Sequence, residues 1–109
     1  MKQIQAYIKK RKLNDVVRAL RKVKNITGMS VMDRDGYGLG WGQTDISSSQ
    51  EMLAGVKIEV FCCDSTVEDV VSAIEQAAHT GLKGDGKIYI SPVEQAVRIS
   101  TGERGENSV

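Results

Sequence analysis

The sequence predicts a single α+β domain in which an antiparallel sheet carries two helices on one face. Its 109 residues suffice for one domain with one core. Apolar residues alternate in four short segments, and two amphipathic segments with helical period lie among them. The order strand, helix, strand, long loop, strand, helix, strand forms two strand–helix–strand halves. This is the split arrangement of ferredoxin-like folds.

The first half begins with a strand, because apolar residues alternate with polar ones over residues 3–9. Asn14 is expected to cap a helix that ends near Asn25, with Val16, Leu20 and their apolar neighbours on one face. β-branched enrichment predicts a second strand over residues 28–33.

A long loop is expected over residues 34–55. The segment holds five glycines, three consecutive serines and little periodicity. A loop of this length in a compact domain is usually functional.

The second half repeats the pattern. Alternation over residues 56–61 predicts a third strand, and Ser65 with Glu68 predicts a capping box at the start of a second helix, which Gly81 can close. A fourth strand follows around residues 88–90 and a short last strand around residues 97–99, and the tail from residue 103 to 109 is expected to be loose.

Composition favours a cytoplasmic protein. No apolar run approaches the roughly 20 residues of a membrane span, and the N-terminal segment lacks a signal-like apolar region. Cys62 and Cys63 are adjacent, which favours reduced thiols over a stabilising disulfide and leaves a redox or metal role as the lesser alternative. His79, the single histidine, has no nominated catalytic partner, so it is expected to cap carbonyls at a helix end, and no enzyme activity is expected.

The segment from Thr80 to Lys87 is the strongest local signal for a ligand. Three glycines leave backbone N–H groups free to converge on an anion, and Lys83 and Lys87 flank them. The spacing is not that of a Walker A loop, and a plain helix-terminating turn is the alternative.

Two other segments have weaker signals. The glycine run at residues 36–42 holds two aromatics and is not followed by a helix, which argues against a dinucleotide fingerprint. The basic run at residues 9–12 could contact nucleic acid, but the net charge is +1 and no aromatic stacking pair is evident. A solvated connection between strand and helix is favoured.

Together these segments resemble the PII nitrogen-regulatory signal-transduction family over nearly the whole chain. The resemblance rests on short stretches at residues 26–31, 36–38 and 56–60, and above all on residues 80–88 with residues 97–99 and 101–103.

The resemblance implies a homotrimer of ferredoxin-like subunits with ATP or ADP in each cleft between neighbours. The phosphate-holding loop would comprise Gly84, Asp85, Gly86 and Lys87. Three further groups of residues would lie next to the nucleotide. Gly36, Tyr37 and Gly38 would contact it at the base of the long loop, and Glu59 and Phe61 would lie near the adenine. The neighbouring subunit would contribute Gly28, Met29, Ser30 and Arg98.

The chain also departs from the family pattern. Leu39 and Gly40 replace a basic and an amide residue, and Gly55 replaces a lysine, at positions that hold magnesium-bridged 2-oxoglutarate in the family. We therefore expect 2-oxoglutarate binding to be weak or absent, with Mg²⁺ possible. Ser100 replaces an arginine, and the loss of this contact to phosphate would weaken the binding of ATP more than that of ADP or AMP. The shortened loop also lacks the tyrosine that is uridylylated in the family. Phosphorylation at residues 47–49 is the less favoured alternative.

These features predict a nucleotide sensor that regulates a transporter, channel or metabolic enzyme through residues 34–55. Contact with a membrane would occur only through such a partner. The alternative is a module of the same fold that binds bicarbonate, another small anion or a metal and has reduced nucleotide sensing.

Overall fold

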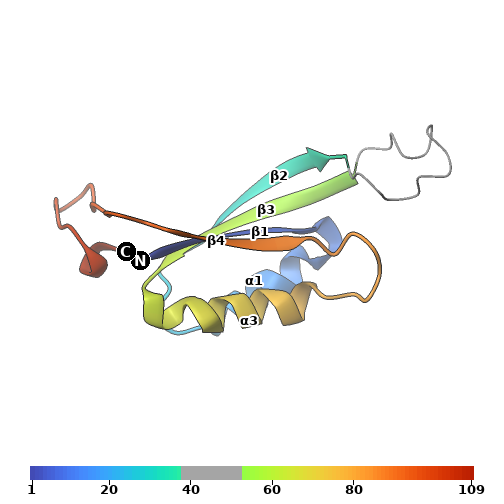
Figure 1. Cartoon of the computed structure of the whole chain (residues 1–109), viewed down its shortest axis with the longest axis horizontal. Helices are drawn as coiled ribbons and strands as arrows, with labels where there is room; N and C mark the ends of the chain where they lie inside the picture. Colours follow the sequence, from blue (N-terminus) through green and yellow to red (C-terminus); the bar gives the residue numbers. More distant parts are fainter. Residues whose placement is uncertain (38–52) are drawn as a thin grey trace.

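The computed structural model describes residues 1–37 and 53–109. Its sheet contains β1 (Lys2–Lys9), β2 (Ser30–Gly36), β3 (Leu53–Cys62) and β4 (Lys87–Pro92). Two helices, α1 (Leu13–Arg21) and α3 (Val67–Ala78), lie together on one face of the sheet (Figure 1). Three short 3₁₀ turns complete the elements: η1 (Lys10–Lys12), η2 (Asp64–Thr66) and η3 (Glu106–Ser108).

The strand order is β2-β3-β1-β4, and every neighbouring pair is antiparallel. This is the ferredoxin-like arrangement that the order of elements predicts. The register sets which side chains share a face. Ile4 pairs with Val60 and Ile90, whereas the next residue, Gln5, pairs with Glu59 and Tyr89 on the opposite face.

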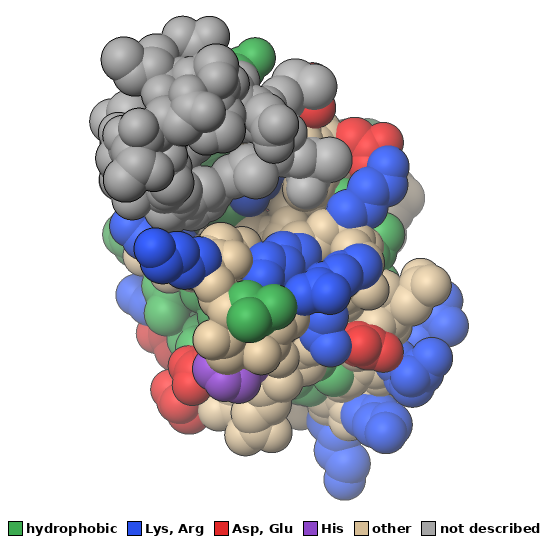
Figure 2. All heavy atoms as spheres, turned by 90° about the vertical axis from the view of Figure 1, so that its right-hand side faces the viewer, with side chains coloured by type: hydrophobic (Ala, Val, Ile, Leu, Met, Phe, Trp, Pro, Cys, Tyr) green, Lys and Arg blue, Asp and Glu red, His purple; other side chains and the backbone are tan. Residues whose placement is uncertain are grey.

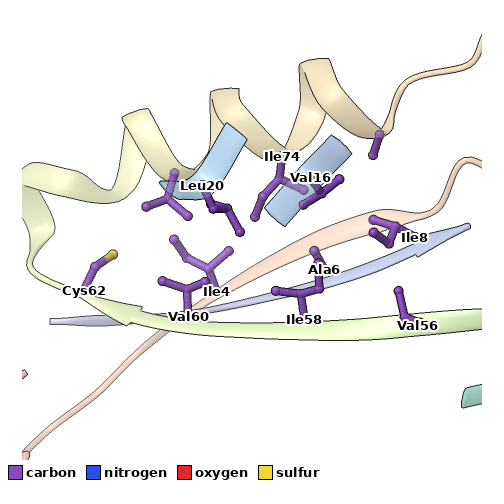
Figure 3. Close-up of a cluster of buried hydrophobic side chains, with 12 residues drawn as sticks. Ile4, Ala6, Ile8, Val16, Leu20, Val56, Ile58, Val60, Cys62 and Ile74 are labelled. Carbon is purple, nitrogen blue, oxygen red and sulfur yellow. The ribbon is translucent and has the colours of Figure 1, made fainter. Parts of the chain in front are cut away.

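The core lies between the sheet and the two helices (Figure 3). Alternate residues of β1 and β3 meet the apolar faces of α1 and α3, as period-2 strands and amphipathic helices require. The apolar side chains that are fully or almost fully buried among the described residues are Ile4, Ala6, Ile8, Val16, Leu20, Val56, Ile58, Val60, Cys62, Val70, Ile74 and Ala78.

Both helices begin differently from the sequence prediction. The cap predicted at Asn14 is wrong, because η1 leads directly into α1 and Lys12, its N-cap, makes no side-chain cap bond. An ion pair of 2.9 Å between Lys12 and Asp15 lies at this end instead. The helix also ends at Arg21, and Asn25 lies beyond it with a positive φ of 69°.

The capping box at Ser65 is also wrong. The chain first winds into η2, in which the Thr66 amide donates to the Cys63 carbonyl at 3.0 Å, and α3 starts at Val67 without a side-chain cap. The N-terminal ammonium group binds Asp64 at 2.9 Å and so ties the start of β1 to this turn.

The long loop is shorter than predicted at both ends. Residues 34–36 belong to β2, and residues 53–55 belong to β3. Backbone pairing between the two strands continues as far as Gly36 and Leu53. Residues 38–52, and with them the expectations for Gly38, Leu39, Gly40 and residues 47–49, lie outside the described part of the chain.

The C-terminal segment contradicts two expectations. Residues 97–99 form only one isolated bridge, between Val97 and Arg104, and Ile99 is fully exposed. The tail is not loose, since the Gly105 amide and the Ser108 hydroxyl both donate to the Ala96 carbonyl at 3.0 Å. The segment after β4 therefore leaves the sheet and folds back on itself (Figure 1).

Candidate functional site

The loop between α3 and β4 is organised by the carboxylate of Asp85. It accepts hydrogen bonds from the Thr80 amide at 2.8 Å and the Gly81 amide at 3.2 Å, and another from the Thr80 hydroxyl. The ammonium group of Lys9, at the end of β1, lies 3.1 Å from Asp85 and 3.1 Å from the Thr80 hydroxyl. Asp85 thus ties the end of the helix, the loop and the sheet together.

These bonds hold the pKa of Asp85 far below its usual range, mainly through the Thr80 hydroxyl and amide, with a smaller contribution from Lys9. A carboxylate engaged in this way is an unsuitable phosphate ligand, because its charge would repel the anion. The Asp85 side chain therefore positions the loop, and its predicted place in the phosphate-holding loop would rest on its backbone N–H.

Lys9 was expected to lie in a solvated basic connection, and for this residue the expectation is wrong. Its side chain is 21% exposed because it crosses to Asp85. His79 likewise does not cap a carbonyl among the described residues; its Nδ1 lies 3.6 Å from Asp85 Oδ2.

Gly86 brings the loop into direct contact with β1. A Cβ atom at Gly86 would lie 1.6 Å from the Tyr7 carbonyl oxygen, and its φ of +106° is a conformation that side chains rarely allow. Gly84 also has a positive φ, of 85°. Backbone geometry therefore requires glycine at Gly86 and favours it at Gly84.

The loop borders a cavity of about 680 Å³ on the sheet face opposite the helices. This volume lies within the usual range of small-molecule sites. Lysine and arginine side chains gather at this end of the molecule (Figure 2). The lining residues are Gln5, Tyr7, Arg34, Gly84, Asp85, Gly86, Lys87 and Tyr89.

Four residues of this cavity, Gln5, Tyr7, Arg34 and Tyr89, were missed by the sequence reasoning. The Tyr7 ring meets the Tyr89 ring edge-on, with centroids 5.9 Å apart. The Arg34 guanidinium carbon lies 5.1 Å from the centre of the Tyr7 ring. The alternation of β1 places Tyr7 on the outer face, but no sequence signal joins it to Arg34, because the two residues lie in strands separated by β3.

Five other predicted residues line a second hollow of about 570 Å³. It borders the segment after β4 and the C-terminus, and the cavity at Gly84–Lys87 shares none of its lining residues. Within one chain the structure therefore does not bring the predicted adenine residues to the phosphate loop. The five residues are Gly28, Met29, Ser30, Glu59 and Phe61.

Glu59 is held in a polar network on the outer face. Lys57 lies 3.2 Å from its carboxylate, and the amides of Gln3 and Gln5 donate to it at 3.3 Å. Lys57 and both glutamines lower the pKa of Glu59. This ionised group connects the two hollows, since Gln5 lines the first and Glu59 the second.

The remaining predicted residues lie apart from both hollows. Arg98 is exposed in the C-terminal segment, where its amide donates to the Glu103 carbonyl at 2.8 Å. Gly36 ends β2, and Tyr37 follows it with 68% of its surface exposed.

The two cysteines are free thiols. Burial raises the pKa of Cys62, which makes its thiolate less accessible. No group of three or more potential metal ligands occurs among the residues that the structure describes. Within the same residues, no helix has the length and apolarity that a membrane crossing would need.

The sheet order and the two helices on one face define a small ferredoxin-like domain, with a glycine-rich loop beside an open cavity. A sequence model of the family described as "Nitrogen regulatory protein P-II" matches residues 1–103. The chain belongs to this family, and its role is that of a signal-transduction regulator.

Curated relatives agree with this assignment. Nitrogen regulatory protein P-II of Azospirillum brasilense is 47% identical, that of Cereibacter sphaeroides 46% and that of Rhodospirillum rubrum 42%. Each alignment spans 113 positions and covers 100% of both chains. The resemblance inferred from the sequence is thereby confirmed.

Proposed function

We propose that this regulator binds an adenine nucleotide, ATP or ADP, with its phosphates held by the loop from Gly84 to Lys87. The observation that carries the proposal is the close packing of Gly86 on Tyr7, which holds a glycine-rich backbone at the rim of a cavity of suitable size. Lys87 lines the same cavity and supplies a cation. The adenine preference rests on the family resemblance.

The nucleotide would bind between subunits of a homotrimer. The division of the predicted residues between two separate hollows supports this arrangement, because only a neighbouring copy could bring the second hollow to the first. The outer sheet face also exposes apolar side chains, with Met32 at 39%, Phe61 at 46% and Tyr89 at 52%. Antiparallel sheets commonly leave one face to solvent with polar side chains, so apolar side chains exposed together on that face indicate a surface that contacts another protein.

Nucleotide state would set the conformation of residues 34–55 and so the activity of a cytoplasmic or membrane-bound target protein. β2 and β3 support this idea. Arg34 of β2 lines the cavity, and the two strands lead directly into and out of the middle of that segment. Mg²⁺ would accompany the nucleotide, and 2-oxoglutarate is not expected as a second effector.

Isothermal titration calorimetry with ATP, ADP and AMP tests nucleotide binding, with and without 2-oxoglutarate. Lys87→Ala should weaken binding of the nucleotides by about tenfold or more, since it removes a charge-assisted contact. Lys83→Ala is the matched control, because Lys83 is exposed and lines neither hollow. The proposal is overturned if none of the three nucleotides binds the wild-type protein at millimolar concentration.

A further inference from the structure

Arg34 follows an unusual path across the sheet. It lies in β2 and pairs with Gly55 of β3, and its side chain passes over β3 to reach the Tyr7 ring on β1. Gly55 leaves the room for this path. A Cβ atom there would lie 3.2 Å from Arg34 Nη2 and 2.9 Å from the Ile8 carbonyl oxygen.

The guanidinium group has few partners in this position. Arg34 Nε is buried and makes no hydrogen bond within residues 1–37 and 53–109, and no salt bridge to Arg34 occurs in the same residues. Asp85, the carboxylate that lines the same cavity, is already engaged by Lys9, and Glu59 on the outer face is engaged by Lys57. The Tyr7 ring holds the cation in place without neutralising its charge.

Arg34 and the glycine loop line one cavity. A guanidinium group offers a planar fork of N–H donors that fits two oxygens of a phosphate, whereas the loop offers backbone donors and Lys87 a point charge. The cavity thus carries a second anion-binding group on β2, separate from the loop before β4.

We propose that Arg34 forms an anion subsite that binds a phosphate group beyond the one held by the glycine loop. This inference rests on the proposed nucleotide site and assigns its phosphate selectivity to Arg34. The phosphate can be the terminal group of a nucleotide or a free inorganic phosphate beside a shorter nucleotide, since the fork recognises the same oxyanion in both. Gly55 is part of the subsite because it keeps the path of the Arg34 side chain open.

Calorimetry on the wild type, Arg34→Met and Arg34→Lys tests the subsite. The titrants are ATP, ADP, AMP, tripolyphosphate, and inorganic phosphate added to the ADP-loaded protein. Arg34→Met should weaken the binding of ATP by about 10- to 100-fold and the binding of AMP by less than about threefold, because only the longer phosphate chain of ATP extends past the loop. Arg34→Lys keeps the positive charge but lacks the planar fork of donors, so its affinity for ATP should fall between those of the wild type and Arg34→Met. Arg21→Gln, at an exposed position of α1, is the control and should match the wild type.

The outcomes separate this proposal from the proposed function. Loss of ATP affinity identifies the terminal phosphate, and loss of inorganic phosphate binding to the ADP-loaded protein identifies the free anion; both support the subsite. Equal affinities of wild type and Arg34→Met for every titrant overturn the subsite and leave nucleotide binding intact. If the wild type binds no nucleotide, tripolyphosphate decides: binding that depends on Arg34 supports the subsite, and no such dependence overturns it. Circular dichroism verifies that each variant is folded.

Discussion

Asp85 and Gly86 shape the loop before β4 by different physical means. Asp85 collects donors from two parts of the chain, residues 80–81 and Lys9, whereas Gly86 permits a backbone approach that any side chain would block. Both effects fix the geometry of Gly84 and Lys87 at the cavity. The two predictions at this scale separate them.

Gly86→Ala should displace the loop from β1 and destabilise the protein by about 1–3 kcal/mol, since both a clash with Tyr7 and a positive φ must be relieved. Urea unfolding measures the stability, and calorimetry should show loss of nucleotide binding. Gly102→Ala is the matched control, because Gly102 has a φ of +73° but nothing within 4 Å of its added Cβ. Equal effects of the two substitutions would refute the role of the Tyr7 contact.

Asp85→Asn should change stability in a pH-dependent way. The pKa of Asp85 is lower in the folded protein than in the unfolded chain, so its charge stabilises the fold above the unfolded value of about 4. This contribution is lost as the pH falls through the folded pKa. The variant should therefore unfold at lower urea concentration than the wild type at pH 7, and the difference should shrink below about pH 4. Glu94→Gln, at an exposed position, should show no such trend; a constant difference for Asp85→Asn at all pH values would contradict the interpretation.

The helices support the site at a distance. α3 packs its apolar face on β1 and β3 (Figure 3). Its C-terminal end leads into the loop in which Thr80 and Asp85 bind Lys9. The stability of the sheet and the conformation of the loop thus depend on the same helix, but through different residues.

Ile74→Ala should cost about 2–5 kcal/mol of unfolding free energy, because Ile74 is 1% exposed and its removal leaves a cavity in the core. Chemical unfolding measures this loss. Nucleotide affinity should remain within about threefold of the wild type under conditions where the variant is folded, since Ile74 lies on the helix side of the sheet. Gln76→Ala, exposed on the same helix, should leave stability nearly unchanged. A small loss for Ile74→Ala would contradict its assignment to the core.

At the scale of the whole molecule, the proposed trimer would join the first and second hollows and the outer sheet face with its exposed apolar side chains. The C-terminal segment leaves the sheet near the second hollow and carries the exposed residues Arg98 and Ile99 (Figure 1). A neighbouring subunit would give these residues a surface to contact.

Met32→Asp should dissociate the trimer. Met32 lies on the outer face of β2 and lines neither hollow, so a charge there would be buried at the subunit contact without a direct effect on a ligand. Size-exclusion chromatography with light scattering should show three times the subunit mass for the wild type and the subunit mass for the variant. Gln76→Asp, on the helix side, should remain trimeric. A wild-type monomer would refute the proposed assembly.

The order of elements, the alternation of β1 and β3 and the loop of glycines before β4 can be predicted from the amino-acid sequence alone. These features are local, because period and glycine spacing are written in consecutive residues. The predicted helix starts are wrong because a 3₁₀ turn precedes each helix at the place where a side-chain cap was expected.

The residues that meet in the loop and line the cavity could be identified only from the three-dimensional fold. Lys9, Asp85 and Thr80 meet because β1 ends where α3 ends, and Arg34 reaches Tyr7 because Gly55 leaves the space between them open. These contacts join residues that lie far apart in the chain and depend on strand register. A one-residue change of register would move the side chains of the strand residues Tyr7, Lys9 and Arg34 to the other face. The alternation of apolar residues indicates which face of a strand is buried, but it does not name the partner residue on the neighbouring strand.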